Sequence, residues 1–208
     1  MIDPPLLLVT DRKQAVEPLA DILAAAFAAG CRWASLREKD LSVPEHVALA
    51  RSLMPLAHRW NARLTVHGGV DIAVAAGTDG VHLAAGGDVT GARTALGQDA
   101  LVGISIHSIA EARSLDPTVV DYAIAGPVFE TASKPRYGPA LGSDGIRAIA
   151  GAARVPVIAI GGINPERVAE IIAAGAAGIA VMGSVMRARD PGAEVRALLA
   201  TLREATGA

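Results

Sequence analysis

Several features that would point to particular classes of protein are absent from the sequence. Cys31 is the only cysteine in 208 residues, which excludes a disulfide framework and a cysteine-based metal site and fits a reducing cytoplasm. Lysine and arginine number 19 against 21 acidic residues. The basic residues are scattered, so the chain has no charge pattern for nucleic acid or for an anionic membrane. We therefore expect a cytoplasmic protein whose partners are small molecules.

Long hydrophobic runs are also lacking. The longest uncharged stretch, 171–186, is interrupted by glycine and is shorter than the ~20 apolar residues of a membrane-spanning helix. The apolar segment near the N-terminus is short and follows no basic region, so we expect neither a signal peptide nor a membrane anchor. Hydrophobic residues nevertheless make up 51% of the chain. This composition favours one domain over residues 1–208, with a large aliphatic core.

Short apolar runs alternate along the chain with longer segments of helical period. The runs are rich in β-branched and aliphatic residues and show little polar alternation, as parallel strands covered by helices require. They are 6–10, 33–37, 63–66, 80–83, 101–106, 122–126, 156–160 and 178–182. Eight strand–helix units in 208 residues predict a small single-domain (β/α)8 TIM barrel, with a doubly wound open sheet as the second choice.

Capping residues mark several helix boundaries. Asn164 and Asp190 each precede a proline, the order expected of an N-cap followed by the first helical residue. Gly30 and Gly175 stand where the left-handed residue after a helix belongs. These signals agree with the boundaries of the proposed units.

Two side chains that could take part in catalysis lie at the end of the fifth run. In "VGISIHS" the period of two places Ser105 and His107 on one face, and Ile104 and Ile106 on the other. The isoleucines should meet the surrounding helices, so Ser105 and His107 should face the barrel axis, with His107 at the carboxyl-terminal mouth. A neutral imidazole there can accept and return a proton near neutral pH, which makes His107 the candidate catalytic residue. We interpret His82, in the fourth run, as structural.

Glycines after the seventh and eighth runs predict a phosphate site. Gly161 and Gly162 follow the seventh run, and Gly183 and Ser184 follow the eighth at a helix start. Glycine lets backbone N–H groups approach an anion, and a helix N-terminus adds a favourable dipole. Because barrel enzymes commonly hold a phosphate in these two loops, we expect the four residues to bind one.

Two basic residues lie at or just after the end of the second run. The segment "SLREKD" places Arg37 and Lys39 on one side of the rim and Glu38 on the other. Cations at the barrel mouth would complement a carboxylate or a phosphate of the substrate.

A long irregular stretch, 128–142, follows the sixth run. Loops of this length usually bind or cover a ligand. Thr131, Ser133 and Lys134 within it offer two hydroxyls and an ammonium, and we expect them to clamp an anionic substrate.

Ordered segments over nearly the whole chain resemble the thiamine phosphate synthase and thiazole tautomerase superfamily. They are "LVTDR", "SLREKDLS", "VDIAVAAGTDGVHL", "ISIHSIAEA", "DYAIAGPVFET", "VPVIAIGGINPERV" and "AGAAGIAVMGSVM". The resemblance implies a small (β/α)8 barrel, in agreement with the unit count, and a thiazole phosphate ligand common to both branches.

The two branches of this superfamily need different side chains. The synthase joins a pyrimidine methyl diphosphate to thiazole phosphate, and Mg²⁺ carries the leaving diphosphate and requires oxygen ligands. In that branch the third strand ends Asn-Asp-Arg, and Gly-Gln and an acidic residue follow the fourth. This chain has "HGG" at 67–69 and "AAGGD" at 84–88, and Ser35 stands where the synthase has Gln. Asp88 alone remains as a possible metal ligand.

The tautomerase branch is the closer resemblance. It shares the weakened third-strand motif, the "FET" at 129–131 and a histidine matching His107. It implies an isomerase without metal or cofactor that converts a dihydrothiazole carboxylate phosphate into the aromatic carboxythiazole phosphate. His107 would move the proton, and the four residues of the phosphate site would hold the phosphate. Arg37, Lys39 or Lys134 would face the carboxylate.

Two alternatives stay open. The first is a divergent, Mg²⁺-dependent thiamine phosphate synthase, since Lys39 and the run from Thr131 to Lys134 follow the synthase pattern. The second is a barrel without catalytic activity that binds thiazole or thiamine phosphates as a regulator. The resemblance allows a homodimer, and no helix pattern selects one.

Overall fold

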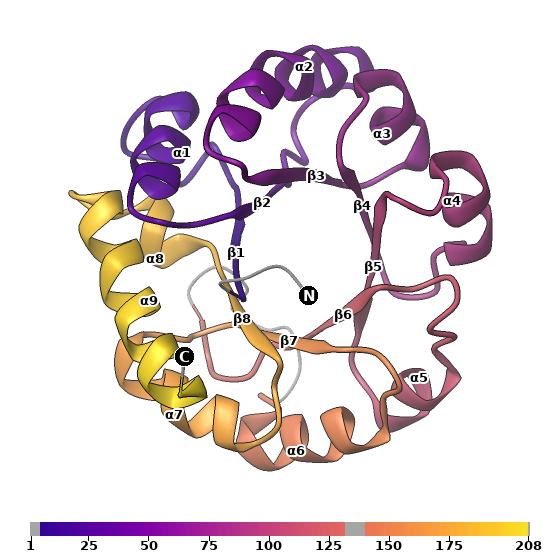
Figure 1. Ribbon diagram of the computed structural model, residues 1–208, viewed down its shortest axis with the longest axis vertical. Coiled ribbons are helices and arrows are strands. Elements are labelled where there is room, and N and C mark those ends of the chain that lie inside the picture. The colour runs from indigo at the N-terminus through magenta and orange to yellow at the C-terminus, as the bar shows by residue number, and fades with distance from the viewer. Residues whose placement is uncertain (1–4, 132–139, 208) are drawn as a thin grey trace.

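The computed structural model describes residues 5–131 and 140–207. Within these residues, eight parallel strands close into a barrel in sequence order (Figure 1). The strands are β1 (Leu6–Val9), β2 (Trp33–Leu36), β3 (Arg63–His67), β4 (Gly80–Leu83), β5 (Leu101–Ile106), β6 (Tyr122–Ala125), β7 (Val157–Ile160) and β8 (Gly178–Val181). The closing pair is β1 with β8, in the register Leu8 to Val181. The expected (β/α)8 barrel is therefore confirmed, and the open sheet is excluded.

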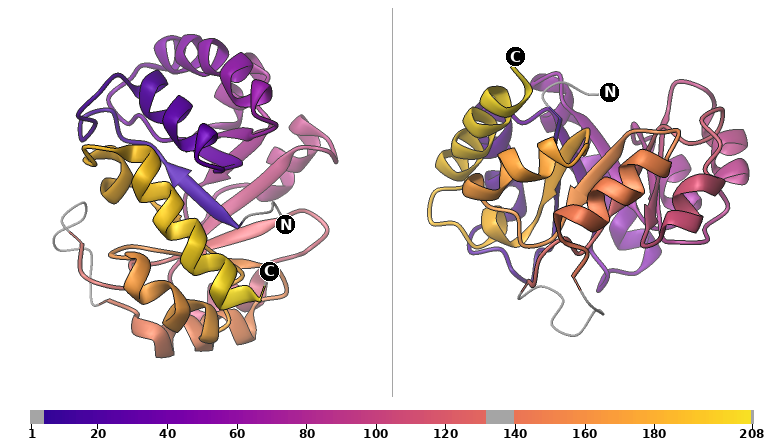
Figure 2. Two further views of the ribbon diagram at one scale, coloured as in Figure 1. Left: turned by 60° about the vertical axis from the view of Figure 1, so that its left-hand side comes forward. Right: turned by 90° about the horizontal axis from the view of Figure 1, so that it is seen from below.

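Helices surround the barrel on its outside (Figures 1 and 2). They are α1 (Leu19–Ala28), α2 (Val43–Arg59), α3 (Val70–Ala76), α4 (Val89–Leu96), α5 (Ile109–Ser114), α6 (Gly142–Ala152), α7 (Pro165–Ala173), α8 (Gly183–Met186) and α9 (Pro191–Thr206). The last of these, α9, packs against α7 and α1 and completes the ring. Across the described residues, we find no helix with the length and apolar character needed to cross a membrane.

The predicted helix caps are present. The Asn164 side chain accepts a hydrogen bond from the Arg167 backbone N–H, and the Asp190 side chain accepts one from Ala193. Gly30 and Gly175 follow α1 and α7 with φ of +110° and +96°, a conformation that glycine adopts without a steric penalty. Local sequence signals thus define where these helices begin and end.

Two apolar cores lie on opposite sides of the sheet. The larger one fills the layer between strands and helices and includes Ile104 and Ile106, as the strand period predicts. The smaller one fills the barrel interior and contains Trp33 and Tyr122, whose rings meet edge to face at 4.5 Å between centroids. Because these two aromatic residues begin β2 and β6, they close the amino-terminal end of the barrel. The open end is therefore the carboxyl-terminal one, where barrel enzymes bind their ligands.

Candidate active site

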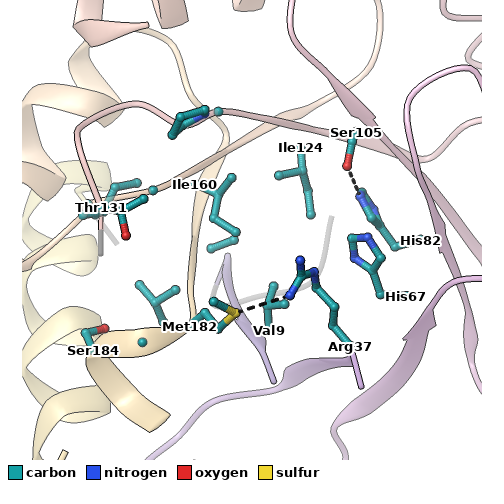
Figure 3. Close-up of a pocket in the computed structure, with 18 of the residues that line it drawn as sticks. Val9, Arg37, His67, His82, Ser105, Ile124, Thr131, Ile160, Met182 and Ser184 are labelled. Carbon is teal, nitrogen blue, oxygen red and sulfur yellow. Dashed lines mark hydrogen bonds between the residues drawn. The ribbon is translucent and has the colours of Figure 1, made fainter. Parts of the chain in front are cut away.

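A cavity of about 340 Å³ lies at the carboxyl-terminal ends of the strands, and residues from all eight strands or the loops after them line it (Figure 3). The structure brings together eight of the residues that the sequence predicts for the site. They are Arg37, Ser105, His107, Thr131, Gly161, Gly162, Gly183 and Ser184. The position of the cavity agrees with the expectation that chemistry occurs at this end of the barrel.

Three predicted residues are not seen at the cavity. Lys39 is exposed and does not line it. The reason is local: β2 ends at Leu36 and the chain enters a turn at Lys39, so the alternation of an extended strand no longer holds there. Ser133 and Lys134 lie outside the described residues.

His107 is held by contacts to helix α5 and to the loop after β6. Its Nδ1 lies 2.9 Å from the carbonyl oxygen of Gly126, and its backbone N–H donates to Glu111 Oε2 at 2.7 Å. Because a carbonyl oxygen only accepts hydrogen bonds, Nδ1 carries the hydrogen in this contact. A neutral His107 therefore has its lone pair on Nε2.

The glycines at the end of β7 allow a close approach of two loops. Gly162 has a φ of +65°, and a Cβ added there would lie 2.7 Å from the Glu130 carbonyl oxygen and 2.7 Å from the Cβ of Phe129. Gly161 has a φ of +106°, and its carbonyl accepts a hydrogen bond from the Phe129 N–H at 3.0 Å. Any larger residue at Gly162 would both strain the backbone and displace the loop after β6.

The end of β8 carries an unsatisfied polar atom. Ser184 Oγ is buried and has no hydrogen-bond partner among the described residues. A buried hydroxyl without a partner costs free energy, and a ligand that accepts its hydrogen bond would remove that cost. Ser184 is the second residue of the short helix α8, after Gly183, and it lines the cavity, which suits the predicted phosphate site.

Arg187 is a cavity residue that the sequence reasoning missed. Its guanidinium covers Gly183, since a Cβ added to that glycine would lie 2.4 to 2.7 Å from Nη1, Nη2 and Cζ. Arg187 Nη1 donates to Gln14 Oε1, and Gln14 Nε2 donates to Asp11 Oδ2 at 2.6 Å. The four-residue spacing from Gly183 to Arg187, about one helical turn, is a signal that could have found it.

Arg37 extends into the cavity from the end of β2 (Figure 3). Its Nη1 lies 4.0 Å from the sulfur of Met182, and among the described residues it forms no ion pair. Thr10 Oγ1 accepts a hydrogen bond from the Arg37 backbone N–H at 3.1 Å and donates one to the buried Glu38 at 2.5 Å. The backbone of Arg37 is thus held while its guanidinium remains available for an anion.

Two histidines on adjacent strands form a pair beside Ser105. The ring centroids of His67 and His82 are 4.7 Å apart, and His82 Nε2 lies 2.9 Å from Ser105 Oγ (Figure 3). His82 is fully buried. Burial lowers the pKa of its imidazole well below the usual value, and positive charge on His67 lowers it further. His82 therefore stays neutral and fixes a side chain of the site, which is more than the structural role expected from the sequence.

This burial predicts a pH-dependent stability. The unfolded chain binds a proton at His82 as pH falls below about 6.5, whereas the folded chain does not, so the free energy of unfolding should fall by up to ~1.4 kcal/mol per pH unit. Urea unfolding between pH 5 and 8 measures this slope. In His82→Phe, the change in the free energy of unfolding with pH below about 6.5 should correspond to the uptake of one proton fewer, whatever the absolute stability of the variant. An equal slope in both proteins would contradict the buried neutral state.

The carboxylates that the synthase branch of the resemblance would use for Mg²⁺ have no counterpart at this cavity. Asp88 is exposed, does not line the cavity and caps α4, where its Oδ1 accepts from the Gly91 N–H at 2.8 Å. Glu130 is the only acidic side chain among the described lining residues. No group of three or more His, Cys, Asp or Glu in the described part of the chain is arranged to hold a metal ion. The described donors therefore do not fit a Mg²⁺ ion held by carboxylates.

Fold and cavity together define a (β/α)8 barrel with a cavity at the carboxyl ends of its strands that two arginines and glycine-rich loops line. A family model described as thiamine monophosphate synthase (TMP-TENI) matches residues 6–185. The chain belongs to this family.

Individual relatives agree with the family. A thiamine-phosphate synthase of Roseiflexus sp. is 38% identical over 202 residues, which cover 95% of this chain and 85% of that protein. The thiamine biosynthesis bifunctional protein ThiM/ThiE of Symbiobacterium thermophilum is 45% identical over 188 residues, 90% of this chain, but the chain spans only 39% of its length. The structure of a thiamine phosphate pyrophosphorylase from Pyrococcus furiosus superposes with a TM-score of 0.85, at 29% identity and 96% coverage of both chains.

These comparisons contradict the tautomerase hypothesis. Relatives of 35% and 38% identity over nearly the whole chain are named thiamine-phosphate synthase, a transferase and not an isomerase. The hypothesis gave one short motif, residues 67–69, more weight than the rest of the chain.

Proposed function

We propose that this protein is a thiamine-phosphate synthase, which joins a pyrimidine methyl diphosphate to thiazole phosphate. The observation that carries the proposal is the similarity to synthases along their whole length: the enzyme of Moorella thermoacetica is 35% identical over 203 residues, 97% of this chain and 96% of that protein. The cavity supports it, because cationic and backbone donors for phosphate groups lie on different strands around an apolar centre.

We place the thiazole phosphate at the ends of β7 and β8. The backbone N–H groups of Gly162 and Gly183, the buried Ser184 hydroxyl and the Arg187 guanidinium are the donors available there. A phosphate would give Ser184 Oγ the partner that it lacks among the described residues. Thr131, on the loop after β6, lines the same part of the cavity.

The diphosphate of the second substrate belongs on the opposite side, at Arg37. In the reaction, the bond between the methylene carbon and the diphosphate oxygen breaks, and the diphosphate leaves with the electron pair. The thiazole nitrogen donates its lone pair to the same carbon, so no proton is transferred in forming the bond. We therefore propose that His107 and Ser105 position the reacting rings, in place of the proton transfer expected for an isomerase.

A coupling assay tests this function. The protein is incubated with the pyrimidine methyl diphosphate and thiazole phosphate, with and without Mg²⁺, and products are identified by mass spectrometry. We expect thiamine phosphate and inorganic diphosphate in equal amounts. Their absence under both conditions would contradict the proposal.

A further inference from the structure

We infer that His67 and Arg37 form a side-chain site for a diphosphate group, in which the guanidinium and the imidazole, packed against the buried ring of His82, take the place of a carboxylate-held metal ion. The choice of diphosphate as the ligand rests on the proposed function. The position and chemistry of the site rest on contacts within β2, β3 and β4.

The three residues lie in one row across adjacent strands. Leu36 pairs with Val66, so Arg37 and His67 are the next residues along β2 and β3, and His67 pairs in turn with His82 on β4. Neighbouring strands are about 4.8 Å apart, a spacing that a diphosphate can bridge. All three line the cavity, and Figure 3 shows Arg37 and His67 directed into it.

The burial of His82 decides where a proton on the histidine pair resides. His82 is fully buried, whereas His67 is only half-buried and faces the cavity. The charged form of a buried imidazole is disfavoured by desolvation, and two charges 4.7 Å apart would repel each other. Of the two rings, His67 is therefore the one that can carry positive charge next to the ligand.

The charges around His67 favour an anion rather than a metal ion. The described charged or titratable residues that line the cavity are Arg37 after β2, His82 on β4, His107 after β5, Glu130 after β6 and Arg187 after α8. Glu130 is the only acid among them, and the places where the resemblance expects carboxylates hold Gly68 and the exposed Asp88. A guanidinium and an imidazolium bind phosphate oxygens by charge-assisted hydrogen bonds without a metal.

Titration calorimetry with inorganic diphosphate in the presence of a chelator tests the site directly. We expect wild-type protein to bind the probe at pH 6.5, and His67→Asn to bind it about 10- to 100-fold more weakly. His58→Asn is the matched control, because His58 is an exposed histidine on α2 beside Asp79, and its affinity should equal that of wild type. Equal affinities of wild type and His67→Asn, or binding that appears only when Mg²⁺ is added, would overturn the inference.

Proton NMR of the imidazole Cε1–H groups gives a second readout that needs no stable variant. On addition of inorganic diphosphate, the titration midpoint of His67 should rise, and the resonance of His82 should stay at its neutral position. A His67 midpoint that does not move in saturating diphosphate would contradict the inference. If the protein produces thiamine phosphate but substitution of His67 does not affect diphosphate binding, only this site is rejected. If the protein binds diphosphate through His67 without metal but does not couple the two substrates, only the proposed function is rejected.

Discussion

Arg37→Gln should lower kcat/KM for the coupling of the two substrates by about 10²- to 10³-fold. Arg37 lines the cavity at the end of β2 and forms no ion pair with a described acidic residue, so its charge is available to the substrate. Loss of a charge-assisted contact to a diphosphate removes roughly 3 to 4 kcal/mol of transition-state stabilisation when it holds both the substrate and the leaving group. Steady-state kinetics with the pyrimidine diphosphate varied measures the change.

The control for Arg37 is an arginine of the outer surface. Arg203→Gln changes the same charge on exposed α9, and its kcat/KM should lie within about twofold of wild type. The two variants should have similar stability, since Arg37 contributes its backbone N–H and not its guanidinium to the hydrogen bond with Thr10. A kcat/KM for Arg37→Gln within threefold of wild type would show that the diphosphate binds elsewhere.

Arg93→Met should reduce the free energy of unfolding by about 2 to 3 kcal/mol. The Arg93 side chain is 7% exposed, and its Nη2 forms an ion pair with Asp121 Oδ2 at 2.6 Å. Its Nη1 donates to the carbonyl oxygens of Gly97 and Ala100 at 2.9 and 2.7 Å. Truncation leaves both carbonyls without this partner, and the buried position of Arg93 makes that loss costly, whereas the Asp121 side chain is 39% exposed and can be rehydrated. Urea denaturation followed by circular dichroism measures the effect.

Two further variants separate this buried network from a general effect of removing arginine. Arg147→Met removes an exposed arginine whose one hydrogen bond to the described residues is long, 3.2 Å to the Ala173 carbonyl, and should cost less than about 0.5 kcal/mol. Arg93→Met combined with Asp121→Asn should be less destabilised than the sum of the two single variants, because no unpaired carboxylate remains. Additive effects would mean that the ion pair is not the source of the stability.

Much of the fold could be predicted because its determinants are local. Parallel strands buried on both faces are continuous aliphatic runs, and each of the predicted runs matches a strand of the barrel to within one residue at either end. Asn164 and Asp190 cap helices as expected. The period of two on β5 placed Ser105 at the cavity and Ile104 in the outer core, since that strand is regular over its whole length.

The site was less predictable where the chain leaves regular structure or where distant segments meet. Lys39 shares the parity of Arg37, but the turn after β2 directs the two residues differently. Arg187 joins the cavity through its packing over Gly183 and its hydrogen bond to Gln14, a residue far away in the sequence. His82 is buried because the closed barrel brings its ring against that of Tyr122. The two residues are far apart in the sequence, so no local pattern predicts this burial.

The branch of the superfamily could not be predicted from one motif. Gly68 stands where the resemblance implies a carboxylate for the metal ion, but this loss does not determine which reaction the remaining cavity performs. Whole-chain similarity to synthases outweighs that local loss. If His67 binds the diphosphate, this chain can catalyse the same reaction as its synthase relatives without the carboxylates that would hold a metal ion.

The most direct test of the account is a single-turnover coupling reaction in chelator, with protein in excess over the pyrimidine methyl diphosphate and thiazole phosphate, quenched at intervals and assayed for thiamine phosphate. We predict that thiamine phosphate and diphosphate appear at the same rate in wild type and much more slowly in Arg37→Gln. Production of no thiamine phosphate by folded wild-type protein, in chelator and in excess Mg²⁺ alike, would contradict the account.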